Sequence, residues 1–291
     1  MKILSVLVAC LFVVSFSNQT FAEDSSAVAY CVNSVGHDRA EVCAGVDSTS
    51  EASAVIYCVN SAGQEAYKPC RGVKTTSEAS AVVYCANSIG KELSPICVGV
   101  KDTSEASAVN YCVSSVSKKA APACVGVKTT SEASALNYCV NVVGSELYPL
   151  CHGVKNTSTV NALGYCVNSV GKDLGLLCYG VTETSQASAL SYCVSSLGKD
   201  VARIVCRGIK DTSEVNALNY CVSVVGKDSA RACRGVKDTT SASAVNYCVN
   251  LVGKDIAPVC RGVRTTTEAS EVNSCVSRVG RDSAIELCRI R

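Results

Sequence analysis

Apolar and polar residues recur along this chain in a helical pattern that returns every 27 residues. One copy shows it clearly, because its apolar residues lie three or four positions apart: Ala79, Val82, Ala86 and Ile89. Such spacing predicts a helix with one apolar face over about fourteen residues. Gly90 ends the periodic stretch, and a shorter apolar segment follows it. Each copy is therefore expected to form a long helix, a glycine turn and a short helix.

A Tyr-Cys pair marks the same place in nearly every copy. The pairs are Tyr30-Cys31, Tyr57-Cys58, Tyr84-Cys85, Tyr111-Cys112, Tyr138-Cys139, Tyr165-Cys166, Tyr192-Cys193, Tyr220-Cys221 and Tyr247-Cys248, and Ser274-Cys275 closes the series. A fixed period in this range is typical of a solenoid, whose stacked repeats share one core. We therefore expect an elongated all-α solenoid of the right-handed type, formed by ten helical hairpins between residues 23 and 291.

After Cys10, twenty cysteines follow at alternating intervals of 12 and 15 residues, with two of the shorter intervals extended to 13. They are Cys31, Cys43, Cys58, Cys70, Cys85, Cys97, Cys112, Cys124, Cys139, Cys151, Cys166, Cys178, Cys193, Cys206, Cys221, Cys233, Cys248, Cys260, Cys275 and Cys288. An even number of cysteines in an exported chain is typical of a disulfide framework. On a single helix, cysteines 12 residues apart would be separated by about 18 Å, beyond the roughly 7 Å reach of a disulfide.

The chain must therefore turn back between the two cysteines of a copy. A glycine five residues after the first cysteine suits the left-handed position just past a helix end, and only Ser117 departs from this pattern. We expect pairing within each copy, from Cys31 with Cys43 to Cys275 with Cys288, and each closed loop contributes up to about 3 kcal/mol. Pairing between copies is the alternative. It would leave the first and last cysteines without partners, although the invariant 15-residue interval favours it.

Most of the long helices are preceded by a capping residue with a glutamate three positions later. The pairs are Ser48/Glu51, Thr75/Glu78, Asp102/Glu105, Thr129/Glu132, Asp211/Glu214 and Thr265/Glu268. This spacing is typical of a capping box, in which each side chain bonds the backbone amide of the other residue. The recurring glutamates are thus expected to cap helices rather than to catalyse a reaction.

The last copy, residues 266–291, differs from the others along one stripe of its helix. Where the ninth copy has Ala244, Tyr247 and Leu251, the last has Glu271, Ser274 and Arg278. Positions three and seven apart share a helix face, so the whole stripe has become polar. We expect this copy to be a polar end cap, and the stripe of the other copies to pack against the next repeat.

The first 22 residues are typical of a secretory signal peptide, with Lys2, an apolar run and a small-residue cleavage site ending at Ala22. Secretion to the periplasm, the cell surface or the extracellular medium is therefore expected. Removal of this segment takes away every Phe and Met in a chain that has no Trp, so the core must consist of small side chains that bury little area each. No transmembrane segment is expected in the mature chain.

The mature chain is nearly neutral, with a formal charge of +1 once Lys2 is removed from a total of +2, so no general attraction for nucleic acid is expected. A basic set nevertheless grows toward the C-terminus: Arg207, Lys210, Arg234, Lys237, Arg261 and Arg264. Cations near helix C-termini complement the helix dipole, which is a purely structural account of these residues. An anionic surface polymer is the alternative partner.

A polar, uncharged stripe on the exposed face of the long helices supplies the candidate ligand-binding residues. These are Asn110, Asn137, Asn141, Asn219, Asn246 and Asn250. Stacking would align their amides into a ladder that hydrogen-bonds an extended glycan or peptide, and a solvated face without function is the alternative. The tyrosines are expected to bridge repeats, with a stacking platform for sugars or bases as their alternative role.

Neither catalysis nor metal binding has support in the sequence. His37 and His152 occupy positions that other copies fill with unrelated residues, and the common hydrolase, metalloprotease, phosphate-loop and C-x2-C patterns are absent. We expect a non-enzymatic scaffold without cofactors, which binds a protein or polysaccharide along its stacked surface. The alternative is a purely structural spacer or surface-coat protein that self-associates.

Overall fold

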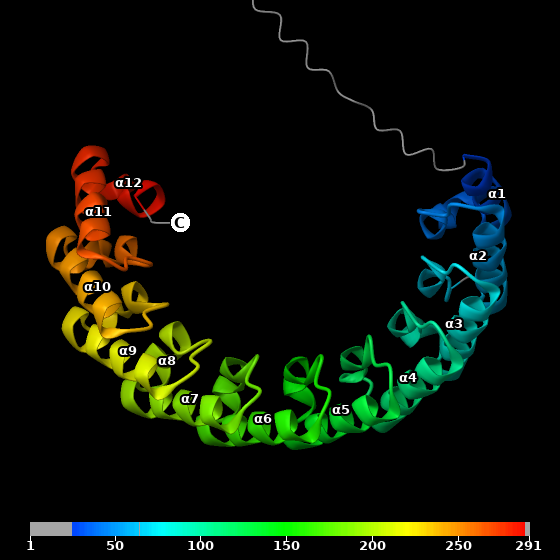
Figure 1. The fold of residues 1–291 in the computed structure, drawn as a ribbon, viewed down its shortest axis with the longest axis horizontal. Helices are drawn as coiled ribbons and strands as arrows, with labels where there is room; N and C mark the ends of the chain where they lie inside the picture. Colours follow the sequence, from blue (N-terminus) through cyan, green and yellow to red (C-terminus); the bar gives the residue numbers. More distant parts are fainter. Residues whose placement is uncertain (1–24, 64, 289–291) are drawn as a thin grey trace, which may run out of the picture.

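The computed structural model describes residues 25–63 and 65–288, and the predicted signal peptide lies outside the described residues. Within these ranges the chain forms helices and connecting turns without strands, which confirms the predicted all-α fold. The helices stack into an open arc, with the long helices in an outer layer and the short helices in an inner layer (Figure 1).

Each repeat contributes one long helix and one short helix. The long helices are α1 (Ser25–Val35), α2 (Thr49–Ala62), α3 (Thr76–Ile89), α4 (Thr103–Ser115), α5 (Thr130–Val143), α6 (Thr157–Val170), α7 (Thr184–Leu197), α9 (Thr212–Val225), α10 (Thr239–Val252) and α11 (Thr266–Val279). The short ones are the 3-10 helices η1 (His37–Cys43), η2 (Lys68–Cys70), η3 (Lys91–Cys97), η4 (Ala121–Cys124), η5 (Ser145–Cys151), η6 (Lys172–Cys178), η7 (Lys227–Cys233) and η8 (Lys254–Cys260), together with α8 (Lys199–Val205) and α12 (Arg281–Leu287).

The core lies between the two layers and runs along the whole arc. Its largest fully buried side chains, Leu136, Leu163, Leu190 and Leu218, occupy the same position in successive long helices. Each long helix packs against the long helices of the neighbouring repeats, as α5 does against α4 and α6. The repeats therefore share one continuous core, as the fixed period predicts.

Ten disulfides connect the two layers, and every one joins cysteines of the same repeat. The first joins Cys31 to Cys43 and the last joins Cys275 to Cys288. The Cα atoms of the Cys139–Cys151 pair are 5.7 Å apart, which is normal for a disulfide. The prediction of pairing within each copy is thus confirmed over the alternative of pairing between copies.

The two longer cysteine intervals are explained by a change of helix type. The repeats that close Cys193 to Cys206 and Cys275 to Cys288 contain one additional residue, and their short helices, α8 and α12, are α-helices. Seven residues of 3-10 helix and eight of α-helix both advance about 12 to 14 Å and both complete a little more than two turns. The second cysteine therefore reaches the same place in either form.

The predicted N-caps are present, but the glutamates act one residue away from the expected partner. Thr75, for example, accepts a hydrogen bond from the backbone amide of Glu78, as predicted. The Glu78 carboxylate, however, accepts from the amide of Lys74, at 2.8 Å, rather than from the amide of the N-cap residue. The same shift occurs at the other five predicted pairs. A longer side chain reaches past the cap. Among the described residues, only Ser241 of α10 closes a true capping box, with Asp238.

The glycines that end the long helices have a positive φ, but their conformation is not the left-handed helical one that we expected. Gly90 has φ 85° and ψ 159°, in the extended positive-φ region that essentially only glycine adopts. The chain therefore leaves each long helix in an extended direction before the short helix begins. Where Ser117 replaces the glycine, α4 ends earlier and Val116 forms its C-cap with a negative φ.

The curvature of the arc follows from the different widths of its two layers. An α-helix with its side chains is about 10–12 Å wide, and a 3-10 helix is wound more tightly. The inner layer also packs through small residues, of which Ala121, Ala123, Ala230 and Ala232 are buried. Each repeat is thus narrower on its inner side, and the stack bends toward that side.

The last repeat forms the predicted polar end. Glu271, Ser274 and Arg278 are exposed there, and Cys275 is partly exposed while the first cysteine of every other repeat is fully buried. On this side no other helix among residues 25–63 and 65–288 covers the long helix of the last repeat. The polar stripe therefore meets solvent where an apolar stripe would otherwise be left uncovered.

At the junction between the fifth and sixth repeats, two glycines leave space for the side chains of the neighbouring helices. A Cβ atom added to Gly164 of α6 would clash with the Val142 side chain of α5, and one added to Gly175 would clash with Leu147. These two glycines have no positive φ. They are required by close packing and not by the backbone conformation.

Removal of a central disulfide should destabilise the array. The Cys139→Ala/Cys151→Ala double variant is expected to lose about 3 kcal/mol of unfolding free energy, because it reopens a short loop in the middle of the core. The matched Cys275→Ala/Cys288→Ala variant should lose less, since its repeat contacts a single neighbour. Urea titration followed by circular dichroism measures both losses. Equal and negligible losses would show that the disulfides do not stabilise the fold.

Filling the space at Gly164 should also destabilise the protein. We expect Gly164→Ala to lose about 1–3 kcal/mol through its clash with Val142, although alanine normally favours a helix over glycine by about 1 kcal/mol. Adding Val142→Ala should restore stability, and Ser191→Ala, at the same position of the next repeat, should be nearly neutral. Thermal unfolding of the three variants and the native protein tests this, and a stabilising Gly164→Ala would contradict it.

Candidate functional site

A row of tyrosines runs along the outer face of the arc and is its most regular exposed feature. It consists of the residues that precede the first cysteine of each repeat: Tyr30, Tyr57, Tyr84, Tyr111, Tyr138, Tyr165, Tyr192, Tyr220 and Tyr247. Their exposed fractions lie between 42% and 47%. Such uniform exposure means that every repeat except the last presents nearly half of a tyrosine to solvent.

The tyrosine row is flanked on both sides by small polar residues. The residues four before and three after a helical position share its face. At Tyr138 these are Ser134 and Asn141, and both are exposed. At Tyr165 they are Asn161 and Asn168, which are exposed as well. The outer face thus combines aromatic rings with uncharged amides and hydroxyls.

One tyrosine of the row hydrogen-bonds the following repeat, as the sequence led us to expect. The Tyr138 hydroxyl donates a hydrogen bond to Oδ1 of Asn161 in the next long helix, at 3.2 Å. The end repeat, which has no following neighbour, has Ser274 at the tyrosine position. A bridging role nevertheless leaves nearly half of each side chain uncovered, so these residues remain accessible to a ligand.

The predicted amide ladder divides into three groups in the structure. Asn141 and Asn250 are exposed beside the tyrosine row, whereas Asn110, Asn137 and Asn219 are only half exposed. Asn246 is buried, with an exposed fraction of 6%. The expectation of a single exposed stripe is therefore wrong, and it fails most clearly for Asn246.

The reason is the contact between successive long helices. Asn246 occupies the same place in its repeat as Gly164, which packs directly on Val142 of the preceding helix. This position faces the neighbouring repeat rather than solvent. The side-chain amide of Asn246 and Oδ1 of Asn219 are buried there without a hydrogen-bond partner, and the Asn137 side chain accepts a hydrogen bond from Asn141 at 3.3 Å.

Ion pairs between neighbouring repeats connect the starts of the inner-layer helices. An acidic residue of one repeat meets a cation of the next in Glu65–Lys91 (3.2 Å), Glu92–Lys118 (3.7 Å), Asp173–Lys199 (3.1 Å) and Asp255–Arg281 (2.9 Å). The hydrogen bond from Lys199 lowers the pKa of Asp173. All these side chains are exposed, so each pair contributes little stability. Many of the charged residues that recur in the sequence thus pair with a residue of the neighbouring repeat.

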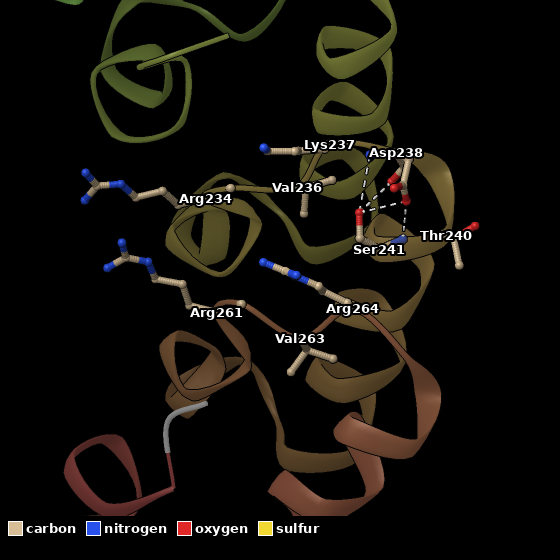
Figure 2. Close-up of a pocket in the computed structure, with 11 residues that line it drawn as sticks. Arg234, Val236, Lys237, Asp238, Thr240, Ser241, Arg261, Val263 and Arg264 are labelled. Carbon is tan, nitrogen blue, oxygen red and sulfur yellow. Dashed lines mark hydrogen bonds between the residues drawn. The ribbon is translucent and has the colours of Figure 1, made fainter. Parts of the chain in front are cut away.

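The predicted basic residues lie elsewhere, on the loops that return from the inner layer to the next long helix. Two successive loops enclose a groove of about 620 Å³, here called the basic groove, which contains Arg234, Lys237, Arg261 and Arg264. Figure 2 shows the cationic ends of all four side chains on the same side of these loops. Arg234, Lys237 and Arg264 form no ion pair with any residue that the structure describes.

Asp238 is the acidic residue in the lining of the basic groove, and it is engaged by the helix that it caps. Its carboxylate accepts hydrogen bonds from the amide and the hydroxyl of Ser241, at 2.8 Å and 3.0 Å. These bonds, led by the one from the amide, lower the pKa of Asp238. The carboxylate therefore stays charged and is directed at the start of α10, as the dashed lines in Figure 2 show.

The sequence had identified the cations of the basic groove but not the groove itself. The signal that would have found it is the replacement of glutamate by Ser241, since most other long helices carry glutamate at this position. The corresponding groove near the N-terminus contains Glu78 together with Arg71, Lys74 and Lys101, and its volume is only about 140 Å³. The groove without the glutamate is thus the larger of the two, and Arg261, where the third repeat has Val98, gives it one cation more.

The described residues include neither a metal-binding cluster nor a membrane-spanning helix. No group of three or more His, Cys, Asp or Glu side chains among the described residues is arranged to hold a metal ion. His37 begins η1 and His152 follows η5, so the two histidines belong to different repeats. Within residues 25–63 and 65–288, no helix has the length and apolar character needed to cross a bilayer.

Comparisons with protein-family models, with curated proteins and with solved structures found no match to this chain. The functional argument therefore depends on the surfaces described above. The ten disulfides are typical of proteins that mature in an oxidising, non-cytoplasmic compartment.

The capping aspartates make stability depend on pH in the acidic range. The amide of Glu214 lowers the pKa of Asp211, as that of Ser241 lowers the pKa of Asp238. Because both pKa values are lower in the folded chain, the stabilisation is complete above the ordinary value of about 3.9 and is lost as pH falls through the lower folded values.

We therefore expect the thermal midpoint of the native protein to fall more steeply below about pH 4 than that of the Asp211→Asn/Asp238→Asn variant. Asparagine preserves the cap, as Asn156 does for α6 by accepting a hydrogen bond from the amide of Thr159 at 2.9 Å. Differential scanning calorimetry across pH 2 to 6 measures the effect. Parallel curves for the two proteins would contradict it.

Proposed function

We propose that this protein is an exported, non-enzymatic scaffold that binds a protein or polysaccharide partner along its stacked surface, in the periplasm, at the cell surface or outside the cell. Among these partners the outer face favours a polysaccharide without charge. The tyrosine row, with each residue 42–47% exposed, is the observation that carries this proposal.

The argument begins with the chemistry of the outer face. Aromatic side chains offer an apolar ring together with a polar group, so they suit partners that are neither fully apolar nor charged. Sugar rings have this character, with apolar C–H faces and hydroxyl edges. Asn141, Asn168 and Asn250 lie exposed beside the tyrosines, where their amides can both donate hydrogen bonds to hydroxyls and accept them.

Repetition of the face favours a polymer over a small ligand. Nine repeats present the same tyrosine in the same helical position, so a chain of repeated sugars meets equivalent contacts along the arc. Weak contacts made together raise the overall affinity, because each additional contact is intramolecular once the first has formed. The disulfides fix the conformation of each repeat and reduce the ordering cost of binding.

Retention on insoluble polysaccharides tests the proposal. The mature chain is expected to be retained by at least one of cellulose, chitin, starch and a β-1,3-glucan at physiological salt. The Tyr138→Leu/Tyr165→Leu/Tyr192→Leu variant should bind that polymer about tenfold more weakly or worse, because stacking on one aromatic ring contributes roughly 1–3 kcal/mol to comparable interactions. Depletion of the protein from solution by increasing amounts of polymer gives the dissociation constants.

Tyr179 provides the matched control. It is 57% exposed but lies at the end of η6 and outside the tyrosine row, so Tyr179→Leu should leave retention unchanged. Circular dichroism confirms that the triple variant remains folded. If none of the four polymers retains the native protein, the polysaccharide proposal is wrong and a protein partner is favoured. Equal losses in the triple variant and in the control would exclude the tyrosine row as the binding surface.

A further inference from the structure

We infer that the basic groove between the loops that follow η7 and η8 binds the carboxylate or sulfate groups of an acidic polysaccharide. The groove lies outside the tyrosine row, and this proposal does not rest on the one made for the outer face. Its lining brings together Arg234, Lys237, Arg261 and Arg264 within about 620 Å³.

Three of the four cations in the groove are available for a ligand. Arg234, Lys237 and Arg264 are exposed, and the inter-repeat ion pairs use a different set of cations at the starts of the inner-layer helices. Asp238 supplies a negative charge, but its carboxylate is held by the amide and hydroxyl of Ser241. Three exposed cations thus share the groove with one carboxylate that is already occupied.

Ser241 is the residue that distinguishes this groove from its counterparts. In the third repeat the equivalent Glu78 lies in the groove, and its carboxylate accepts a hydrogen bond from the Lys74 amide at 2.8 Å. Glu214 and Glu268 make the same contact with Lys210 and Arg264. The ninth repeat alone combines basic loops on both sides with a serine at this position. An external anion can therefore occupy the space that an internal carboxylate fills elsewhere.

The arrangement favours a polymer of anionic groups over a single small anion. Arg234 and Arg261 occupy the same position in successive repeats, and so do Lys237 and Arg264, and Arg207 and Lys210 extend both series by one more loop. Guanidinium groups bind carboxylate and sulfate through two parallel hydrogen bonds. Anionic groups spaced along a sugar chain would meet these pairs one after another.

Two other classes of anionic partner fit the groove less well. Nucleic acids are usually bound with aromatic side chains that stack on the bases, and no aromatic residue lines the basic groove. A lipid surface would need an exposed apolar patch beside the cations, but Val236 and Val263 are buried, at 6% and 1% exposure. An acidic polysaccharide requires neither feature.

Three polymers with one backbone test the proposal: dextran sulfate, carboxymethyl dextran and unmodified dextran, each immobilised on a biosensor. The mature native chain is expected to bind at least one charged form at physiological salt and not the unmodified form. The comparison of sulfate with carboxylate identifies the preferred group. Arg234→Gln/Arg261→Gln should weaken this binding about tenfold or more, because each variant residue loses charge-assisted hydrogen bonds.

The Ser241→Glu variant tests the groove in a second way, because it leaves all four cations in place and adds a carboxylate. It introduces the glutamate that most other repeats have, and Asp238 still caps the helix. The added carboxylate should weaken binding by at least about tenfold. Arg71→Gln/Lys74→Gln changes the equivalent loop near the N-terminus and is the matched control. This control should retain the native affinity, as should the tyrosine triple variant.

Several results would overturn the inference. Failure of both charged dextrans to bind the native chain would remove the proposed ligand class. Equal weakening by the N-terminal control and by Arg234→Gln/Arg261→Gln would show attraction to overall charge and not to the groove. Tighter binding of a single-stranded oligonucleotide, lost in the same groove variants, would assign the groove to nucleic acid. A Ser241→Glu variant with native affinity would show that the missing glutamate has no role.

Discussion

The closure of each repeat by its own disulfide is the constraint on which the rest of the structure depends. The core is formed by alanine, valine, leucine, isoleucine and cysteine, and such small side chains bury little area each. A bond of fixed length between the two layers holds the short helix against the long one, even where the short element is a brief 3-10 segment such as η4. With both layers fixed, stacking of repeats positions the tyrosines outside and the basic loops between the layers.

Most of the fold could be predicted because its determinants are local and repeated. Helical periodicity, the glycine after all but one of the long helices and the cysteine intervals together require a hairpin, and the polar stripe of Glu271, Ser274 and Arg278 marks the last repeat. What could not be predicted depends on contacts between elements. The 3-10 form of the inner helices sets the curvature, and glutamates such as Glu78 reach one residue beyond the cap because their side chains are long enough to do so.

The candidate sites were predicted less well, for a related reason. Helical spacing tells which residues share a face, but it does not tell how far a neighbouring helix covers that face. Asn246 is therefore buried while Asn250, one turn further along the same helix, is exposed. The basic groove was visible only as a list of cations, because the spacing of residues does not give the volume that two successive loops enclose. A repeat protein shows such sites best where one copy departs from the others.

Because each cysteine of the described repeats is bonded to a partner in its own repeat, the unit of covalent structure coincides with the unit of sequence. An internal duplication or deletion of one whole copy in the gene would leave all remaining sulfur atoms correctly matched. It would only lengthen or shorten the arc, and with it the reach of the outer face. With pairing between copies, each disulfide would instead join two repeats, so the bonding of each repeat would depend on its neighbours. The architecture is therefore suited to changing its length over evolutionary time without passing through a misbridged intermediate.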